Sequence, residues 1–118
     1  MAVRETNPNF MNGVPELLIL RLLRQEEMYG YEIVQEIHSR SCEVIGVGEG
    51  VVYPVLHKLE HDGALTSRRK TVKGRSRIYY SVTPVGSHRL AELSEVWSKL
   101  AGAIQEMLTG GQGGEVVQ

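Results

Sequence analysis

The feature that most constrains this fold is one strand-forming segment set among stretches of helical periodicity. Residues 64–71 and 75–82 flank a short loop that contains Lys73 and Gly74. Strict alternation of apolar and polar side chains predicts a half-buried strand. In the second stretch the side chains predicted to face the core are Ile78, Tyr80 and Val82, and those predicted to face solvent are Arg77, Tyr79 and Ser81. We therefore expect one antiparallel β-hairpin.

Four other stretches have apolar residues at the spacing of an α-helix: 15–24, 31–40, 50–62 and 84–108. The first is apolar almost all round, so we expect it to be the buried centre of the fold. In the third we place Pro54 in the first turn, where its missing N–H matters least. Gly63 should end that helix in a left-handed conformation, and Thr83 should cap the last helix, with Pro84 at its first position.

The resulting order of elements is helix, helix, helix, hairpin, helix. This order predicts a mainly α chain with a winged helix-turn-helix, made of three helices and a two-stranded wing, over residues 13–82. Residues 83–108 form an added C-terminal dimerisation helix. Residues 1–12 are expected to be a flexible arm because they are polar and contain Asn-Pro-Asn. The Gly-rich residues 109–118 are expected to be a disordered tail.

Charge is balanced over the chain but not along it. Thirteen basic and fourteen acidic side chains give a net charge of −1. Six cations nevertheless fall within residues 68–77, where no Asp or Glu occurs: Arg68, Arg69, Lys70, Lys73, Arg75 and Arg77. No apolar run reaches the length of a membrane span, and no signal-peptide pattern opens the chain, so we expect a cytoplasmic protein.

The third helix and the hairpin together predict a surface that binds double-stranded DNA. A major groove admits one α-helix, and a neighbouring basic ribbon can reach phosphates. The expected contact residues are Gly50, Tyr53, Pro54, His57, Lys58, Arg68, Arg69, Lys73, Arg75 and Arg77. Other interpretations remain open: a solvated surface, an RNA or anionic-membrane surface, or a winged helix that binds protein instead of DNA.

The last helix has apolar residues spaced 3, 4, 3, 4 and 3 apart, which is typical of a seam that packs on another helix. The expected dimer-interface residues are Leu90, Leu93, Trp97, Leu100, Ile104 and Met107. Alternatively, the stripe folds onto its own domain. A homodimer would present two reading helices to a palindromic operator. Trp97 could also hold a small, planar, apolar effector together with Leu93, Val96 and Leu100.

Other chemistries have weaker signals. His57, Glu60 and His61 match a zinc-peptidase pattern, but the chain is too small for a peptidase body. An adventitious or regulatory metal at His57 and His61 is favoured over a catalytic site, but not over a site without metal. No phosphate-binding Gly-rich loop is present. Cys42 is the one cysteine, and lone cysteines are more often inert than redox-sensing. The sequence therefore predicts neither an enzyme nor a cofactor.

Taken in order, these residues resemble the PadR family of transcriptional regulators, in the subgroup with one C-terminal helix, over about residues 13–108. The motifs are LLIL at 17–20, YGYEI at 29–33, GVVYPVLHKLE at 50–60, DGAL at 62–65, GRSRIYY at 74–80 and TPVG at 83–86.

The resemblance implies a homodimeric winged-helix repressor that a small molecule releases from its operator. It matches Tyr53 to a contact with the DNA backbone, Arg75 and Arg77 to the wing, and Trp97 to a pocket aromatic. Two positions depart from the family pattern: Val51 stands where Thr or Ser is common, and Ile78 where Lys is frequent.

Overall fold

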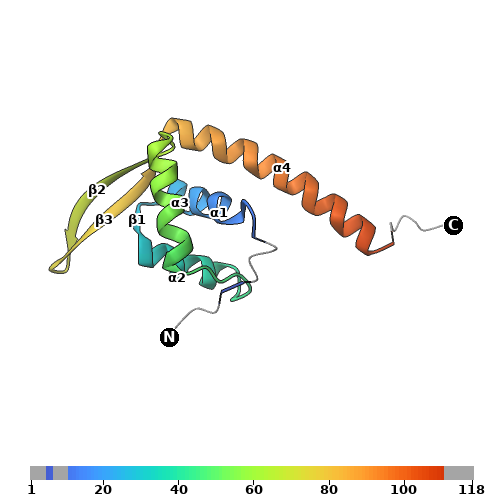
Figure 1. Cartoon of the computed structure of the whole chain (residues 1–118), viewed down its shortest axis with the longest axis horizontal. Helices are drawn as coiled ribbons and strands as arrows, with labels where there is room; N and C mark the ends of the chain where they lie inside the picture. The colour runs from blue at the N-terminus through green and yellow to red at the C-terminus, as the bar shows by residue number, and fades with distance from the viewer. Residues whose placement is uncertain (1–4, 7–10, 111–118) are drawn as a thin grey trace.

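The computed structural model describes residues 5–6 and 11–110 and shows a winged helix-turn-helix with a long C-terminal helix (Figure 1). The elements in chain order are α1 (Val14–Gln25), β1 (Met28–Tyr29), α2 (Gly30–Arg40), α3 (Glu49–His61), β2 (Leu65–Val72), β3 (Arg75–Val82) and α4 (Pro84–Leu108). The predicted fold class is confirmed, and the boundaries of the expected helices and strands differ by at most one residue.

The core lies between the first three helices and the base of the sheet. Its fully buried side chains include Ile19, Leu20, Met28, Ile33, Val52, Leu56 and Leu59. Helix α1 contacts α2, α3, α4 and β3, so it is central as predicted. It is not buried all round, because Arg21, Arg24 and Gln25 are exposed.

The sheet has three strands in the order β1–β3–β2, whereas the sequence predicted two. The missed strand, β1, pairs Met28 with Tyr80 and Tyr29 with Tyr79. Two residues are too few to show a period of two, so no pattern could predict it. The third strand also corrects the expectation for Tyr79, which is buried because it packs edge-on against Tyr29.

The C-terminus of α3 and the N-terminus of α4 test the capping residues predicted from the sequence. Gly63 has φ +83°, and the Thr83 hydroxyl accepts a hydrogen bond from the Gly86 N–H at 3.1 Å, so both predicted caps are confirmed. Pro54 is a correction, since α3 begins at Glu49 and places this proline in the second turn. There it has no N–H to donate to the carbonyl of Gly50.

The expected N-terminal arm contacts the domain at residues that the structure describes. The backbone N–H of Thr6 donates to the Gly46 carbonyl at 2.7 Å, and the Thr6 hydroxyl accepts from the Gly46 N–H at 2.7 Å. Met11 packs against the core. Residues 1–4, 7–10 and 111–118, which include most of the expected tail, lie outside the described residues. Within the described ranges, no helix is long and apolar enough to span a membrane.

Helix α4 is anchored in its first two turns and then extends past the body of the domain (Figure 1). Arg89 pairs with Glu16 at 2.7 Å and with Asp62 at 3.3 Å, and Gly86 lies against the Ala64 carbonyl. Leu90 is 3% exposed and belongs to the core. The prediction that Leu90 forms part of a dimer interface is therefore wrong, because its own domain already covers it.

Two Gly→Ala substitutions in α4 should have opposite effects. A Cβ at Gly86 would overlap the Ala64 carbonyl oxygen, which is backbone and cannot move aside, so we expect Gly86→Ala to destabilise the fold by about 2 kcal/mol or more. A Cβ at Gly102 would meet nothing, so Gly102→Ala should stabilise by about 0.5–1 kcal/mol through helix propensity. Urea unfolding measures both free energies; equal effects would show that α4 is not seated at Gly86.

Candidate nucleic-acid interface

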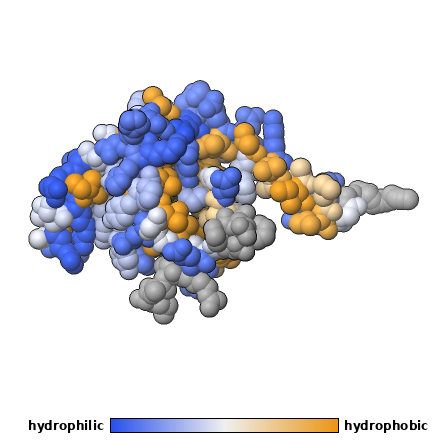
Figure 2. All heavy atoms as spheres, viewed as in Figure 1, coloured by the Kyte–Doolittle hydropathy of each residue, from blue (hydrophilic) through white to orange (hydrophobic). Residues whose placement is uncertain are grey.

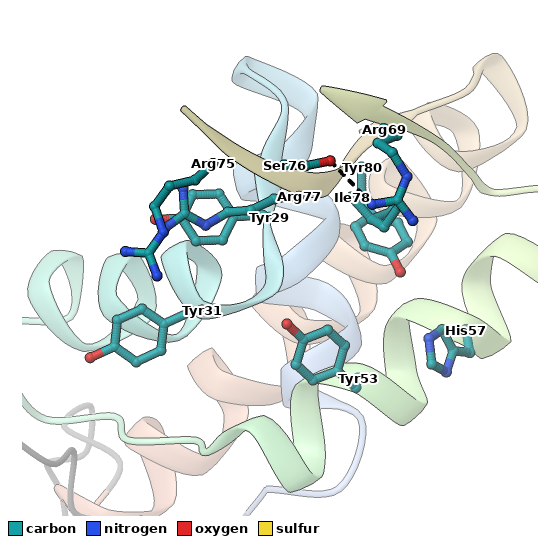
Figure 3. A pocket seen from close by; sticks show the side chains of 10 residues that line it. All are labelled: Tyr29, Tyr31, Tyr53, His57, Arg69, Arg75, Ser76, Arg77, Ile78 and Tyr80. Carbon is teal, nitrogen blue, oxygen red and sulfur yellow. Dashed lines mark hydrogen bonds between the residues drawn. The ribbon is translucent and has the colours of Figure 1, made fainter. Parts of the chain in front are cut away.

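A cleft of about 870 Å³ opens between the wing and the N-terminal turns of α2 and α3 (Figure 3). Its lining residues are Tyr29, Tyr31, Tyr53, His57, Arg69, Arg75, Ser76, Arg77, Ile78 and Tyr80. Five of them were predicted as DNA contacts: Tyr53, His57, Arg69, Arg75 and Arg77. The structure thus gathers cationic, phenolic and imidazole side chains around one hollow, and none of the lining residues is acidic.

Tyr53 is held at the α3 side of this cleft by the absence of a side chain at Gly30. A Cβ on Gly30 would overlap the Tyr53 ring and hydroxyl, so the ring can lie here only over glycine. The Tyr53 side chain remains 37% exposed, and its ring lies 6.2 Å from that of His57. Partial burial is the main cause that raises the pKa of Tyr53, and the nearby negative charge of Glu49 raises it further. The phenol therefore stays a hydrogen-bond donor at neutral pH.

The wing arginines divide between the two faces of the hairpin. Arg69 lies on the face toward α3, where its guanidinium donates to the Ser76 hydroxyl at 3.2 Å (Figure 3). Arg75 and Arg77 project from β3 near Tyr29 and Tyr31. Lys73 is exposed in the turn with φ +52°. Arg69 therefore lies on one face of the hairpin and Arg75 and Arg77 on the other, with Lys73 in the turn that joins the two strands.

Arg68 departs from the expected arrangement. Alternation along β2 turns it to the face away from Arg69, where its guanidinium donates two hydrogen bonds, at 2.8 and 3.1 Å, to the Glu27 carboxylate. The Lys70 ammonium binds the same carboxylate. Two of the six cations therefore have an acidic partner that a reading of residues 68–77 alone could not show.

Glu27 is held ionised by these two partners. The hydrogen bond from Arg68, and then that from Lys70, lower the pKa of Glu27 from 4.5 to about 2. A carboxyl whose pKa is lower in the folded than in the unfolded chain stabilises the fold at pH values above the unfolded pKa. That contribution falls away as the pH drops from about 4.5 toward about 2.

We therefore expect Glu27→Gln to lower the free energy of unfolding at neutral pH, and this difference from the wild type to shrink as the pH falls from about 4.5 to about 2. Urea unfolding at a series of pH values measures it. Glu26→Gln, at the exposed neighbouring residue, is the matched control and should show no such pH-dependent difference. A Glu27→Gln effect that stays constant down to about pH 2 would contradict the ion pairs.

The remaining predicted residues of α3 lie on its exposed side. Gly50, Pro54 and Lys58 are exposed, and the Lys58 ammonium pairs with Asp62 at 3.2 Å. This contact is the leading cause of the lowered pKa of Asp62. His61 is exposed one turn beyond His57. Among residues 5–6 and 11–110, no three His, Cys, Asp or Glu side chains cluster in a way that could hold a metal ion.

A second feature is the apolar stripe along the free part of α4, visible as orange spheres in Figure 2. Trp97 is 43% exposed, Ile104 49% and Met107 83%. Leu93, Val96, Trp97 and Leu100, the four predicted effector residues, line one cavity of about 210 Å³ against the start of α1. Sequence reasoning missed the residues on the opposite wall of this cavity: Asn12, Gly13 and Leu17.

One sequence signal could have indicated the tyrosines of the cleft that were missed. Tyr29 and Tyr31 flank Gly30 but were interpreted only as the opening of a helix. Tyr80 was predicted to be a core residue and is buried, although it also reaches the cleft. A glycine between two tyrosines at a helix start is the signal that could have indicated close packing by a third aromatic ring.

A three-helix core, an exposed third helix and a cationic β-ribbon beside it define a winged helix-turn-helix domain of the kind found in transcriptional regulators. Residues 19–92 match the transcriptional regulator PadR-like family. The chain belongs to this family, whose members are regulators and in general not enzymes.

Relatives support the same assignment. The chain is 36% identical over 92 residues to the transcriptional regulator Rv3488 of Mycobacterium tuberculosis, covering 78% of this chain and 83% of that protein. A transcriptional regulator from Clostridium thermocellum has a similar structure, with TM-score 0.77 and 27% identity over 86% of this chain and 96% of that one. A PadR family regulator from Eggerthella lenta has TM-score 0.73 and 28% identity, covering 86% and 87%.

Proposed function

We propose that this regulator is a cytoplasmic, homodimeric repressor that binds a palindromic operator in double-stranded DNA. The observation that supports this most is the cleft that gathers Tyr53 and His57 of α3 with Arg69, Arg75 and Arg77 of the wing. Helix α3 offers hydrogen-bond donors at its exposed side for a major groove, and the wing offers cations for the adjacent phosphates.

Local charge, and not the net charge of −1, decides what binds at this surface. Among the residues that the structure describes, Arg69, Lys73 and Arg75 form no ion pair, so their charges are available to phosphates. Neutralising several phosphates per subunit releases counterions, which makes binding fall steeply as salt increases.

The exposed stripe of α4 supports the homodimer. Leaving Trp97, Leu100, Ile104 and Met107 in water is costly, since each buried apolar side chain of this size contributes about 1.5–3 kcal/mol. A two-fold partner helix with the same stripe would cover them. Such a dimer would present two copies of α3, which suits half-sites about one DNA turn apart.

Duplex binding by the wild-type chain tests the proposal. DNA from the region upstream of its own coding sequence is the first candidate operator, and footprinting should show two protected half-sites. Affinity should fall steeply between about 50 and 200 mM salt. A winged helix that binds protein, the alternative function, would show weak duplex binding without protected half-sites. Transcription from the footprinted promoter, with and without the protein, distinguishes a repressor from an activator.

The cavity beside Trp97 supports relief of repression by a small, planar, apolar effector. Its lining is mostly aliphatic with one half-exposed indole, which suits stacking on a flat ring. Such compounds should quench Trp97 fluorescence and weaken duplex binding, and Trp97→Ala should remove the effect on binding. An effect on duplex binding that survives Trp97→Ala would place the effector elsewhere.

A further inference from the structure

We infer that a cluster of side chains on one face of the wing, made of Glu27, Tyr29, Lys70, Arg77 and Tyr79 and named the wing clamp here, sets the direction in which the wing presents Arg69 and Arg75. The inference rests on the proposed DNA binding. It assigns Arg77 a positioning role, exerted through Tyr29, in place of the phosphate contact that its place in the basic segment suggested.

The contacts within the wing clamp form a continuous chain. The Arg77 guanidinium lies 4.3 Å from the centre of the Tyr29 ring. The Tyr29 and Tyr79 rings are 5.4 Å apart and meet edge to face, at 75°. The Lys70 ammonium lies 4.4 Å from the centre of the Tyr79 ring and also binds Glu27. Each step is a favourable cation–aromatic, aromatic–aromatic or ionic contact.

Strand register places the clamp on one face of the hairpin. Lys70 pairs with Arg77, and Arg68 with Tyr79, so these four side chains share a face. The other face is held to α3, where the Ser67 hydroxyl donates to Glu60 at 2.6 Å. The hairpin is therefore held on both faces: at Ser67 on the face toward α3, and as far out as the Lys70–Arg77 pair on the clamp face.

The clamp stands where the hairpin leaves the body of the domain. Strand β1 pairs with β3 only at Tyr79 and Tyr80, so residues 75–78 have β2 as their one strand neighbour. An isolated two-stranded ribbon is at best marginally stable in water. Stacking of Arg77 on Tyr29 extends the support past the end of β1. Without it, the outer hairpin that carries Arg69, Lys73 and Arg75 is free to change its angle to α3.

Four substitutions separate positioning by Arg77 from direct contact. Arg77→Lys keeps the charge but loses the planar stack, so we expect duplex affinity to fall roughly three- to tenfold. Arg24→Lys is the matched control, because it makes the same substitution at an exposed arginine of α1 that lines no part of the cleft, and it should bind as the wild type does. Tyr29→Leu should match Arg77→Lys in its loss, whereas Tyr29→Phe keeps the ring and should bind as the wild type does.

The double variant Arg77→Lys with Tyr29→Leu decides whether the two residues act as a unit. If Arg77 acts through Tyr29, the double variant loses no more affinity than either single variant. Losses that multiply, or a Tyr29→Leu variant that binds as the wild type does, would overturn the positioning role and make Arg77 an independent contact.

A measurement without DNA tests the clamp separately from the proposed function. In the free protein, the Tyr29 ring current should shift the NMR signals of the Arg77 side chain upfield. That shift should persist in Tyr29→Phe and vanish in Tyr29→Leu. Unshifted Arg77 signals in the wild type would show that the clamp does not form. If the wild type bound no duplex, the proposed function would fail, but these spectra would still show whether the clamp forms. If Tyr29→Leu did not fold, Arg77→Lys and Tyr29→Phe would still test both the clamp and its effect on DNA binding.

Discussion

Ile104→Lys combined with Met107→Lys is expected to convert the proposed dimer into a monomer and to lower operator affinity by about 10²–10⁴-fold. Both side chains lie in the exposed stripe of α4, at 49% and 83% exposure. A two-fold interface contains each residue twice, so four apolar side chains are lost and four charges would have to be buried. In a dimer, binding of one subunit to its half-site holds the second subunit close to the other half-site. A monomer loses this gain in affinity from high effective concentration.

Sedimentation equilibrium measures the first effect and duplex titration the second. Gly102→Lys is the matched control because it places the same side chain in the same helix, two residues from Ile104 and about 200° around the axis. The space around Gly102 is open, so this variant should fold and stay dimeric. A double variant that remains dimeric would show that the α4 stripe is not the interface.

Removing Arg69 and Arg75, two arginines of the cleft that form no ion pair among the described residues, should weaken DNA binding at the cleft itself. Arg69→Ala combined with Arg75→Ala takes four cations from a dimer, and each charge-assisted hydrogen bond contributes about 1.5–3 kcal/mol. We expect affinity at low salt to fall by about 10³-fold or more. The slope of log affinity against log salt should become shallower by about 3–4, since about 0.9 is lost per phosphate contact.

The control for this pair is Arg24→Ala, which removes an exposed arginine of α1 that lines no part of the cleft. It changes the net charge by the same amount per substitution, so it measures the general effect of lost charge. If Arg24→Ala flattened the salt slope as much per residue as the pair does, the DNA would not lie in the cleft. An unchanged slope in the double variant would favour a protein partner for this surface.

Much of the site could be predicted because its parts follow from local rules. The exposed position of Tyr53 and His57 follows from helical spacing opposite Val52, Leu56 and Leu59. The hairpin and its turn follow from strand alternation and from the glycine at position 74, and both Lys73 and Gly74 have positive φ in the structure. These features depend on neighbours within a few residues along the chain, and the periodicity of the sequence records such neighbours directly.

The errors share a different cause. Arg68 was grouped with Arg69 because the two are adjacent, but its partner Glu27 is 41 residues away in the sequence. Tyr79 was predicted to face solvent, but Tyr29 of β1 packs against it. Leu90 was predicted to lie in a dimer interface, but it is part of the hydrophobic core of its own domain. In each case a distant segment supplied the environment of the residue.

The sequence by itself determined the order of helices and hairpin, the caps at Gly63 and Thr83, and the concentration of positive charge, since each rests on side-chain type and local spacing. Only the tertiary structure decided which cations point into the cleft, that Tyr53 can lie over Gly30, and where α4 leaves the core at Leu90. The physical reason is that burial and charge pairing depend on distances between segments, and those distances exist only once the chain has folded.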